Sequence, residues 1–496
     1  MKPVIKFAVL SLCAVLVCRT SLADPPLDGA LDPSFGPDSS HPGINASLGS
    51  AGNPTIAGIA LEPDGHLIAV GTVEVTGQPD GVLHPLIVSL QPNGTARTDF
   101  CGVTACYLPG LDPLGGIHLN DQNARAVAVQ SDGKIIVAGA ATDRATGSTR
   151  GFVRRLLSDG VPDTSFRTGG IVAGLLNTVY NAVVIDPRDD SILIAGWGTQ
   201  DGNGQNGKTD RDFYVVHYDK DGGKFGDKFI AFDQGASNTD MAWAISLAGN
   251  RVVLAGQAQQ TPYLADGDPR INCAVAAVLL PDLTLDPDWG SAFDPGKTTI
   301  GFDAFVATPK HESRDVCRAV VTRHDGKVIV GGESNWTFAN TDDSSDYSIA
   351  ILEDGFIDKR MSNEYALFGD AGHHNSVTGM IVQSDDKVVF SGEAGISDPT
   401  QAPSNFGAGR MNVDGTIDFD FGLGGTIAPP YDYTAAPNAG TAQYATALTQ
   451  GLKGQPILAG VNFYWDIANN RPGTSPNPMF MQLLKDRIFF NGYESP

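Results

Sequence analysis

A short unit of two apolar runs, a turn and a closing glycine recurs along this 496-residue chain and limits what it can fold into. Its clearest copy is AVAVQSDGKIIVAG at residues 126–139, where Asp132 and Gly133 separate the two runs. Asp-Gly between apolar runs is a strong β-hairpin signal, because the turn needs a positive φ that glycine adopts without strain. The closing Gly139 marks the end of the second strand or a bend in it. The unit therefore predicts paired strands.

The pattern occurs in seven segments, and in each the turn residue stands seven positions before the closing glycine. The segments are 58–71, 126–139, 183–196, 243–256, 319–332, 379–392 and 447–460. The closing glycines are 57 to 76 residues apart, so the inner spacing is kept while surface loops absorb the variation. A third apolar run follows each unit, as at 152–157 before Asp159-Gly160. A fourth strand is expected before some units, as at 170–175.

Stacking of these repeats predicts the architecture. The runs are apolar at successive residues, as at 192–195, which is typical of strands covered on both faces. Sheets of three or four strands cover their faces by stacking on each other, and radial stacking of seven sheets gives an all-β, seven-bladed β-propeller. An open stack of sheets is the alternative, and it leaves exposed edges.

Residues near the propeller axis should be small, because the blades crowd together there. Five units begin with a small residue: Gly58, Ala126, Ala319, Gly379 and Ala447. Trp243 breaks this pattern, and we expect it to fill the central channel or a gap between blades.

A second motif appears as DGALDPSFG at 28–36, DGVPDTSF at 159–166 and DGTIDFDFG at 414–422. Together with the unit at 126–139, these stretches resemble the delta-60 repeat, whose signature is DGxLDxSFG. The resemblance implies an exported, bacterial, β-propeller-like repeat protein and transfers no activity. The first copy precedes the first unit, while the last unit is followed by none. We therefore expect residues 27–36 to lie beside the last blade.

The N-terminus, residues 1–23, is typical of a signal peptide. Lys2 and Lys6 precede an apolar stretch over 7–17, and a small-residue cleavage site ends at Ala23. The apolar stretch is too short to span a membrane. We predict a secreted, periplasmic or cell-surface protein without a transmembrane segment in the mature chain, consisting of one propeller over residues 24–493.

The C-terminal residues 486–496 resemble a short sorting tail of exported bacterial proteins. The alternative is that residues 488–490 simply finish the last strand. The formal net charge of −23 disfavours nucleic acid as a partner.

Four cysteines remain after the predicted cleavage: Cys101, Cys106, Cys273 and Cys317. An even number in an oxidising compartment indicates two disulfides, with three possible pairings. We expect Cys101–Cys106 as a local pair and Cys273–Cys317 between neighbouring repeats. A metal site would need a ligand spacing that these residues do not show.

The chain contains no nucleophile elbow, phosphate loop or zinc-protease motif, and we assign no catalytic residue, metal or cofactor. We predict a monomeric, non-catalytic binding or cell-envelope-associated protein whose extracellular ligand, a glycan or a protein, is unknown. The alternative is a propeller enzyme, a lyase or hydrolase acting on a glycan or another polymer.

The most variable segments follow the closing glycines and should emerge on one face, where repeat folds tend to carry function. We expect the ligand to contact four aromatic residues on that face: Trp197, Tyr263, Trp336 and Trp465. The alternative is that these side chains fill gaps between blades.

Overall fold

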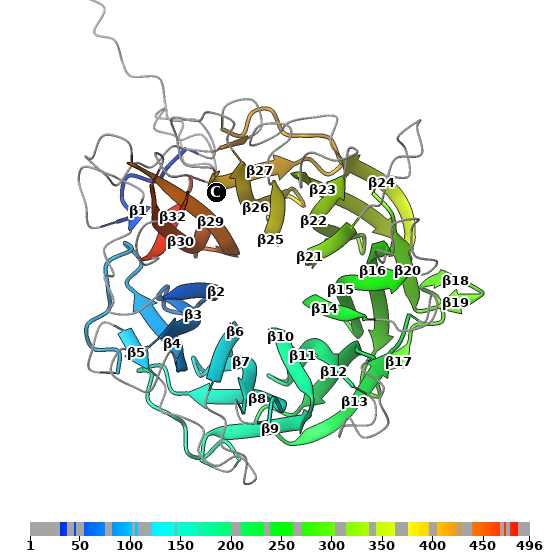
Figure 1. Cartoon of the computed structure of the whole chain (residues 1–496), viewed down its shortest axis with the longest axis horizontal. Coiled ribbons are helices and arrows are strands. Elements are labelled where there is room, and N and C mark those ends of the chain that lie inside the picture. The colour runs from blue at the N-terminus through cyan, green and yellow to red at the C-terminus, as the bar shows by residue number, and fades with distance from the viewer. Residues whose placement is uncertain are drawn as a thin grey trace, which may run out of the picture.

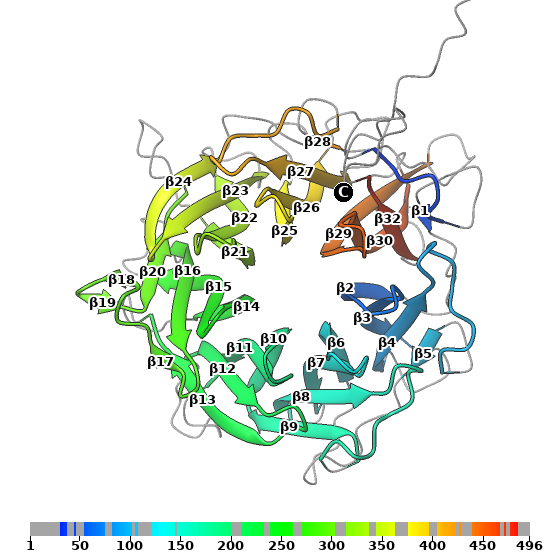
Figure 2. The same ribbon diagram turned by 180° about the vertical axis from the view of Figure 1, so that it is seen from behind.

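The computed structural model describes residues 30–36, 44–45, 54–74, 82–101, 105–107, 121–143, 146–167, 169–199, 210–232, 239–260, 270–302, 314–336, 344–362, 375–395, 404–422, 426–427, 439–466, 471–472 and 477–484. The regular elements of these residues are all β-strands. In this part of the chain no helix has the length and apolarity of a membrane span. Figures 1 and 2 show the sheets following one another around a central opening, as in a β-propeller.

Three four-stranded antiparallel sheets come first, each pairing its strands in chain order. The first contains β2 (Thr55–Leu61), β3 (Leu67–Glu74), β4 (Leu83–Leu90) and β5 (Ala105–Tyr107). The second contains β6 (Asp121–Val129), β7 (Ile135–Thr142), β8 (Thr149–Leu156) and β9 (Ile171–Leu176). The third contains β10 (Thr178–Ile185), β11 (Ile192–Gly198), β12 (Asp212–Tyr218) and β13 (Lys224–Ile230).

The next two groups of strands share one sheet through a single parallel pair, Ile271 with Arg314. The first group contains β14 (Met241–Ala248), β15 (Arg251–Gln260) and β16 (Arg270–Leu279), with β17 (Thr284–Leu285) and β20 (Lys297–Ile300) both paired to β16. A separate hairpin, β18 (Gly290–Ser291) with β19 (Asp294–Pro295), projects from it (Figure 1). The second group contains β21 (Arg314–Thr322), β22 (Val328–Trp336), β23 (Ser344–Glu353) and β24 (Phe356–Ser362).

A further four-stranded sheet contains β25 (Ser376–Val382), β26 (Val388–Gly395), β27 (Ser404–Met411) and β28 (Thr426–Ile427). The last sheet contains β29 (Ala439–Gln450), β30 (Pro456–Asp466), β31 (Arg471–Pro472), β32 (Asn477–Gln482) and the N-terminal β1 (Ile44–Asn45). In every group the first of the long strands lies nearest the central opening (Figure 1): these inner strands are β2, β6, β10, β14, β21, β25 and β29.

Segments from the two ends of the chain meet in the last sheet. β1 pairs with β32, and Leu31 forms an antiparallel bridge with Leu483. The Asp32 amide donates to the carbonyl of Gln482 at 2.9 Å, and the Gln482 side-chain amide donates to Asp32 Oδ2 at 2.7 Å. The expectation that residues 27–36 lie beside the last blade is confirmed for the described residues 30–36.

The turn of the repeated unit has a local explanation. Asp132 Oδ1 accepts the amide of Lys134 at 3.1 Å, and Gly133 between them has a φ of 83°. Asp325 and Lys327 repeat this contact at 3.0 Å. A short acceptor side chain followed by a residue with positive φ is therefore what the sequence supplies at these turns.

The DGxLDxSF motif connects successive sheets. Its aromatic residue lies beside the Asp-Gly turn of the next sheet, so closely that a Cβ on that glycine would meet the ring. A Cβ at Gly222 would lie 2.7 Å from Phe166 of the DGVPDTSF copy. A Cβ at Gly160 would likewise lie 2.7 Å from Phe100, which follows the Asn93-Gly94 turn of the first sheet. Phe35, in the N-terminal copy of the motif, makes the same contact with Gly94 of the first sheet.

The core lies between neighbouring sheets. One cluster joins Ile68 and Val70 of β3 to Val137 of β7, and each of these side chains is fully buried. Another cluster joins Leu67 of β3 to Phe480 of β32, so the first sheet also packs on the last. Burial on both sides explains why the strands are apolar at successive residues.

Candidate functional site

Each inner strand contains a β-bulge at the same place. The extra residue lies opposite the closing glycine of the neighbouring strand, as Arg125 does between the pairs Ala124–Gly139 and Ala126–Ala138. The extra residues, which we call the bulge ring, are Ala57, Arg125, Asn181, Trp243, Arg318, Thr378 and Thr446.

The closing glycine is required by this bulge. A Cβ at Gly139 would lie 1.9 Å from the carbonyl oxygen of Asn123, and one at Gly332 would lie 1.8 Å from that of Val316. The closing glycines of the other repeats show the same overlap at 1.7–1.9 Å. The backbone of the inner strand therefore approaches a position where no side chain fits.

The residue after each bulge is small because the strands crowd at the centre. A Cβ at Gly379 would lie 2.7 Å from Leu448 Cβ, for example. The sequence pattern aligned Trp243 with these small residues, and this was wrong. A two-residue turn joins Ala248 to Arg251, whereas five residues separate Val129 from Ile135. This difference shifts the register, so Ala244 takes the small position and Trp243 joins the bulge ring.

The bulge ring surrounds a cavity of about 200 Å³ at the centre of the molecule. Each inner strand contributes its bulge residue and the two residues that follow it, such as Arg125, Ala126 and Val127. The small residues after the bulges leave the bulge side chains as the main source of chemical variety around this cavity. Trp243, which was expected to fill the central channel or a gap between blades, lies in the wall of this cavity.

Polar bulge side chains link neighbouring sheets. Thr378 Oγ1 donates to the carbonyl of Ala445 at 2.7 Å, and Thr446 Oγ1 donates to that of Ile56 at 2.6 Å. The second bond connects the last sheet to the first. Hydroxyl groups in the ring are thus committed to structure, which distinguishes them from the larger side chains.

Arg125, Asn181, Trp243 and Arg318 form a continuous arc. Arg125 Nη1 donates to Asn181 Oδ1 at 3.1 Å, and Asn181 Nδ2 donates to the carbonyl of Ala242, beside Trp243, at 2.8 Å. The Arg318 guanidinium lies 5.5 Å from the centre of the Trp243 ring. The arc carries two guanidinium groups and one indole towards one cavity.

The two arginines differ in how their charge is balanced. Arg318 pairs with Glu333, with a shortest distance of 2.7 Å. Arg125 has no ion pair with a carboxylate among the described residues, and its Nε is buried without a hydrogen-bond partner. Burial lowers the pKa of the Arg125 guanidinium below its usual value. Arg125 is therefore a half-buried cation with unused hydrogen-bond donors.

The structure describes only part of the predicted aromatic surface. Trp197 lies in β11, half-buried, with the Arg211 guanidinium 4.3 Å from its ring centre. Trp336 and Trp465 lie in β22 and β30, and their side chains are outside the described part. Tyr263 is outside it entirely. The aromatic binding surface stays a prediction.

The predicted disulfide between Cys273 and Cys317 is confirmed, with the two Cα atoms 5.0 Å apart. It ties β16 to β21 immediately beside the bulge residue Arg318. Cys101 is also disulfide-bonded, but the side chain of Cys106 lies outside the described part. Residues 1–23 and 486–496, with the predicted signal peptide and tail, also lie outside it.

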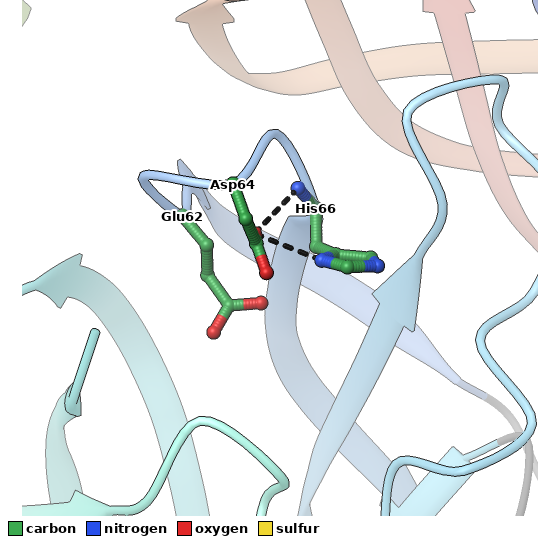
Figure 3. Close-up of side chains that lie close together, drawn as sticks. All are labelled: Glu62, Asp64 and His66. Carbon is green, nitrogen blue, oxygen red and sulfur yellow. Dashed lines mark hydrogen bonds and ion pairs between the residues drawn. The ribbon is translucent and has the colours of Figure 1, made fainter.

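Glu62, Asp64 and His66 form a cluster of metal-ligand types that the sequence analysis did not single out (Figure 3). His66 Nδ1 lies 2.8 Å from Asp64 Oδ1, and its Nε2 lies 3.1 Å from Gln91 Oε1. Glu62 is buried, which raises its pKa to about 7, and it contacts Arg97 at 3.2 Å. Each group already has a protein partner, so the cluster is explained as a side-chain network around a turn.

A second cavity of about 360 Å³ lies between β9 and the outer strands of the third sheet. Tyr214 and Tyr218 line it, but both side chains are buried. The Tyr214 hydroxyl donates to Asp227 at 2.6 Å, and the Tyr218 hydroxyl lies 3.1 Å from that of Tyr180. These hydroxyls serve internal packing, so the bulge ring remains the stronger candidate.

Residues 130–166 match a family described as a domain of unknown function (DUF5122) beta-propeller. These residues span the turn at Gln130, β7, β8 and the following DGVPDTSF motif. The match supports a propeller-repeat family for this stretch. No curated protein matches the chain.

Solved structures with a similar chain course include the polysaccharide lyase Uly1, at 10% identity, covering 94% of this chain and 98% of that one, with a TM-score of 0.45. The WD40 domain of Neurospora crassa Pan2 has 11% identity, coverages of 91% and 97%, and a TM-score of 0.45. An alpha-L-arabinanase of Penicillium chrysogenum has 14% identity, coverages of 92% and 98%, and a TM-score of 0.38. Likeness at this level carries no functional conclusion.

Proposed function

We propose that this chain is an exported, monomeric β-propeller of seven blades, built from delta-60 repeats over residues 24–493, that binds an extracellular ligand without catalysis. The observation that carries the proposal is the bulge ring. Guanidinium, indole and amide groups from successive inner strands converge on one central cavity. Propellers offer a ligand several independent side chains at such a point, because every blade contributes one equivalent position.

Closure of the ring is supported by contacts between the ends of the chain. β1 and Leu31 pair with the last strands, and Phe35 packs against Gly94 of the first sheet. The hydrogen bond from Thr446 to Ile56 repeats, between the last and first sheets, the contact that Thr378 makes with Ala445. The last sheet is therefore joined to the first by the same kind of contact that joins other neighbouring sheets.

Export is supported by the disulfide between Cys273 and Cys317, because such bonds persist in oxidising compartments. The N-terminal residues 1–23 have the charge and apolar pattern of a signal peptide. Expression with this segment should deliver the mature chain, beginning at Asp24, outside the cytoplasm. N-terminal sequencing of the exported protein tests the cleavage site, and light scattering after size exclusion tests the monomer.

Binding at the bulge ring is tested by two matched tryptophan variants. The purified mature chain is screened against arrays of glycans, peptidoglycan fragments and peptides, and the best ligand is titrated by calorimetry. Trp243→Ala should weaken binding by about 30-fold, since a central aromatic contact is worth roughly 2 kcal/mol. Trp197→Ala, at the predicted loop surface, should leave the affinity within about twofold of wild type.

The reverse result would place the ligand on the aromatic loop surface and contradict a site at the bulge ring. Thermal melting of both variants controls for unfolding. The same incubations are examined for new reducing ends and for unsaturated products absorbing in the ultraviolet. Cleavage of any polymer by wild type that Trp243→Ala loses would favour the alternative, a propeller lyase or hydrolase.

A further inference from the structure

One part of the bulge ring is chemically unlike the rest. Arg125, Asn181, Trp243 and Arg318 occupy four successive inner strands, whereas Ala57, Thr378 and Thr446 occupy the other three. The ring therefore has a large, cationic and aromatic side and a side of small residues. Free space lies where the side chains are short.

Arg125 stands at the boundary between these two sides. Its neighbour in one direction is Asn181, whose Oδ1 accepts a hydrogen bond from Arg125 Nη1 at 3.1 Å. Its neighbour in the other direction is Ala57, whose methyl group offers no acceptor. A guanidinium has five N–H donors, and only the Nη1 contact uses one of them among the described residues.

The orientation of Asn181 is fixed, so it does not compensate further. Its Nδ2 donates to the carbonyl of Ala242, which leaves Oδ1 facing Arg125. Arg125 Nε is buried and has no partner. A buried donor left without an acceptor costs free energy, and a charged donor costs more than a neutral one. Arg125 lines the central cavity, so the guanidinium N–H groups that face this cavity are suited to an acceptor from outside the chain, whereas Nε itself is covered.

We propose that the central cavity binds an oxyanion, the carboxylate, phosphate or sulfate group of a ligand, against the free donors of Arg125. This inference rests on the proposed binding function and names the chemistry of its ligand. The guanidinium fork matches the two oxygens of such a group. The Trp243 ring flanks the site, and Arg318, neutralised by Glu333, adds no second unbalanced charge.

The net negative charge of the chain makes the Arg125 guanidinium the more important for binding an anion. At −23 the molecule repels anions at long range, so an anion reaches the centre only if local contacts outweigh that repulsion. Adding salt screens the long-range repulsion and also weakens the local contact. The affinity should therefore come from specific hydrogen bonds. We expect anions of equal charge but different shape to bind with different affinities.

The test uses the mature chain and defined probes: citrate, inorganic phosphate, sulfate, trigalacturonate and the neutral maltotriose. Each is titrated by calorimetry and by tryptophan fluorescence, with wild type, Arg125→Gln and Arg188→Gln. Arg188 is the matched control, because its side chain is 52% exposed and pairs with Asp186 away from the bulge ring. The four anionic probes separate carboxylate, phosphate and sulfate as the source.

At least one anionic probe should bind wild type with one site per chain, and maltotriose should not compete for that site. Arg125→Gln should weaken the binding roughly 10- to 100-fold, the range for losing a charge-assisted hydrogen bond. Arg188→Gln should change it less than twofold. Equal binding by wild type and Arg125→Gln, or binding of no anionic probe, would overturn the inference.

A separate measurement keeps the test decisive if Arg125→Gln does not fold. An anion bound at the cavity must alter the emission of Trp243, so the fluorescence change should be lost in Trp243→Phe while calorimetric binding persists. An unaltered fluorescence change would place the anion elsewhere. A neutral ligand that needs Trp243 and ignores Arg125 would leave the proposed function intact and refute only the oxyanion.

Discussion

Replacing Gly139 by alanine is the most direct test of how the inner strands are built. The added Cβ would lie 1.9 Å from the carbonyl oxygen of Asn123, whereas real Cβ atoms essentially never come closer than 3.0 Å. The two strands must therefore separate by more than 1 Å at the bulge. The atoms in the way are backbone, so no side chain can rotate to make room.

The magnitude follows from two contributions. Overpacking a close contact of this kind costs about 1–3 kcal/mol or more. Separating the strands weakens about two ladder hydrogen bonds, each worth about 1 kcal/mol. We expect Gly139→Ala to lower the free energy of unfolding by about 3–5 kcal/mol, a large share of the roughly 5–15 kcal/mol of a typical protein.

Gly226 in β13 supplies the control, because a Cβ there meets nothing within 4 Å. Gly226→Ala should leave stability unchanged or raise it by about 0.5–1 kcal/mol, since alanine restricts the unfolded chain. Urea unfolding is followed by circular dichroism and by fluorescence, and agreement of the two probes checks that one transition is measured. A difference below about 1 kcal/mol between the two variants would refute the steric account of the bulge.

Three further predictions address other contacts. Replacing Cys273 and Cys317 by serine opens a loop closed by a disulfide across 44 residues and should lower the free energy of unfolding by about 4 kcal/mol, measured against the oxidised wild type. Phe166→Ala, at a fully buried side chain, should cost about 3–5 kcal/mol, whereas Phe293→Ala, at a fully exposed one, should cost almost nothing in the same urea assay. Burial raises the pKa of Glu62 from 4.5 to about 7, so folding takes up a proton at this side chain between these two pH values. The stability that this group contributes is therefore lost as the pH rises from about 4.5 to 7. Glu62→Gln should flatten that part of a plot of the urea unfolding midpoint against pH.

The strand pattern of the chain was accessible from sequence because it rests on local chemistry. The unit at 126–139 became β6 and β7, and the apolar run at 152–157 became β8 over Thr149–Leu156. Alternation between apolar runs and Asp-Gly turns encodes both strand and hairpin within a few residues.

The bulge ring was not accessible in the same way. Its members range from Ala57 to Trp243 and share no property except their position before a small residue. A bulge is visible only when two strands are paired, because it is defined by two residues facing one. The closing glycine was the available signal. Its function, which is to let the carbonyl of the opposite strand come close, becomes visible only when the pairing of the two strands is known.

The position of Trp243 at a bulge could not be predicted either, because the strand register of its repeat differs. Its repeat has a two-residue turn, so counting back from the closing glycine lands one residue early, on the tryptophan rather than on Ala244. The repeat containing Asn181 has six residues between Ile185 and Ile192, and the count errs by one in the opposite direction. Fixed spacing between the turn residue and the closing glycine therefore concealed these differences. Relative to the unit at 126–139, the Trp243 repeat has a shorter turn with a longer paired stretch between the bulge and the turn, and the Asn181 repeat has a longer turn.

The pairing of residues 30–36 with the last strands constrains the order in which the chain can fold during synthesis. Asp32 leaves the ribosome 450 residues before its partner Gln482. Until that partner arrives, the first segment has no strand to pair with, while each intermediate sheet already has its own hairpins. A contact between residues so far apart in sequence has a large loop-closure cost and forms slowly. A nascent or truncated chain ending before residue 477 thus lacks the contacts between its N-terminal segment and β32, and leaves the groups that make them exposed to proteases and to other chains.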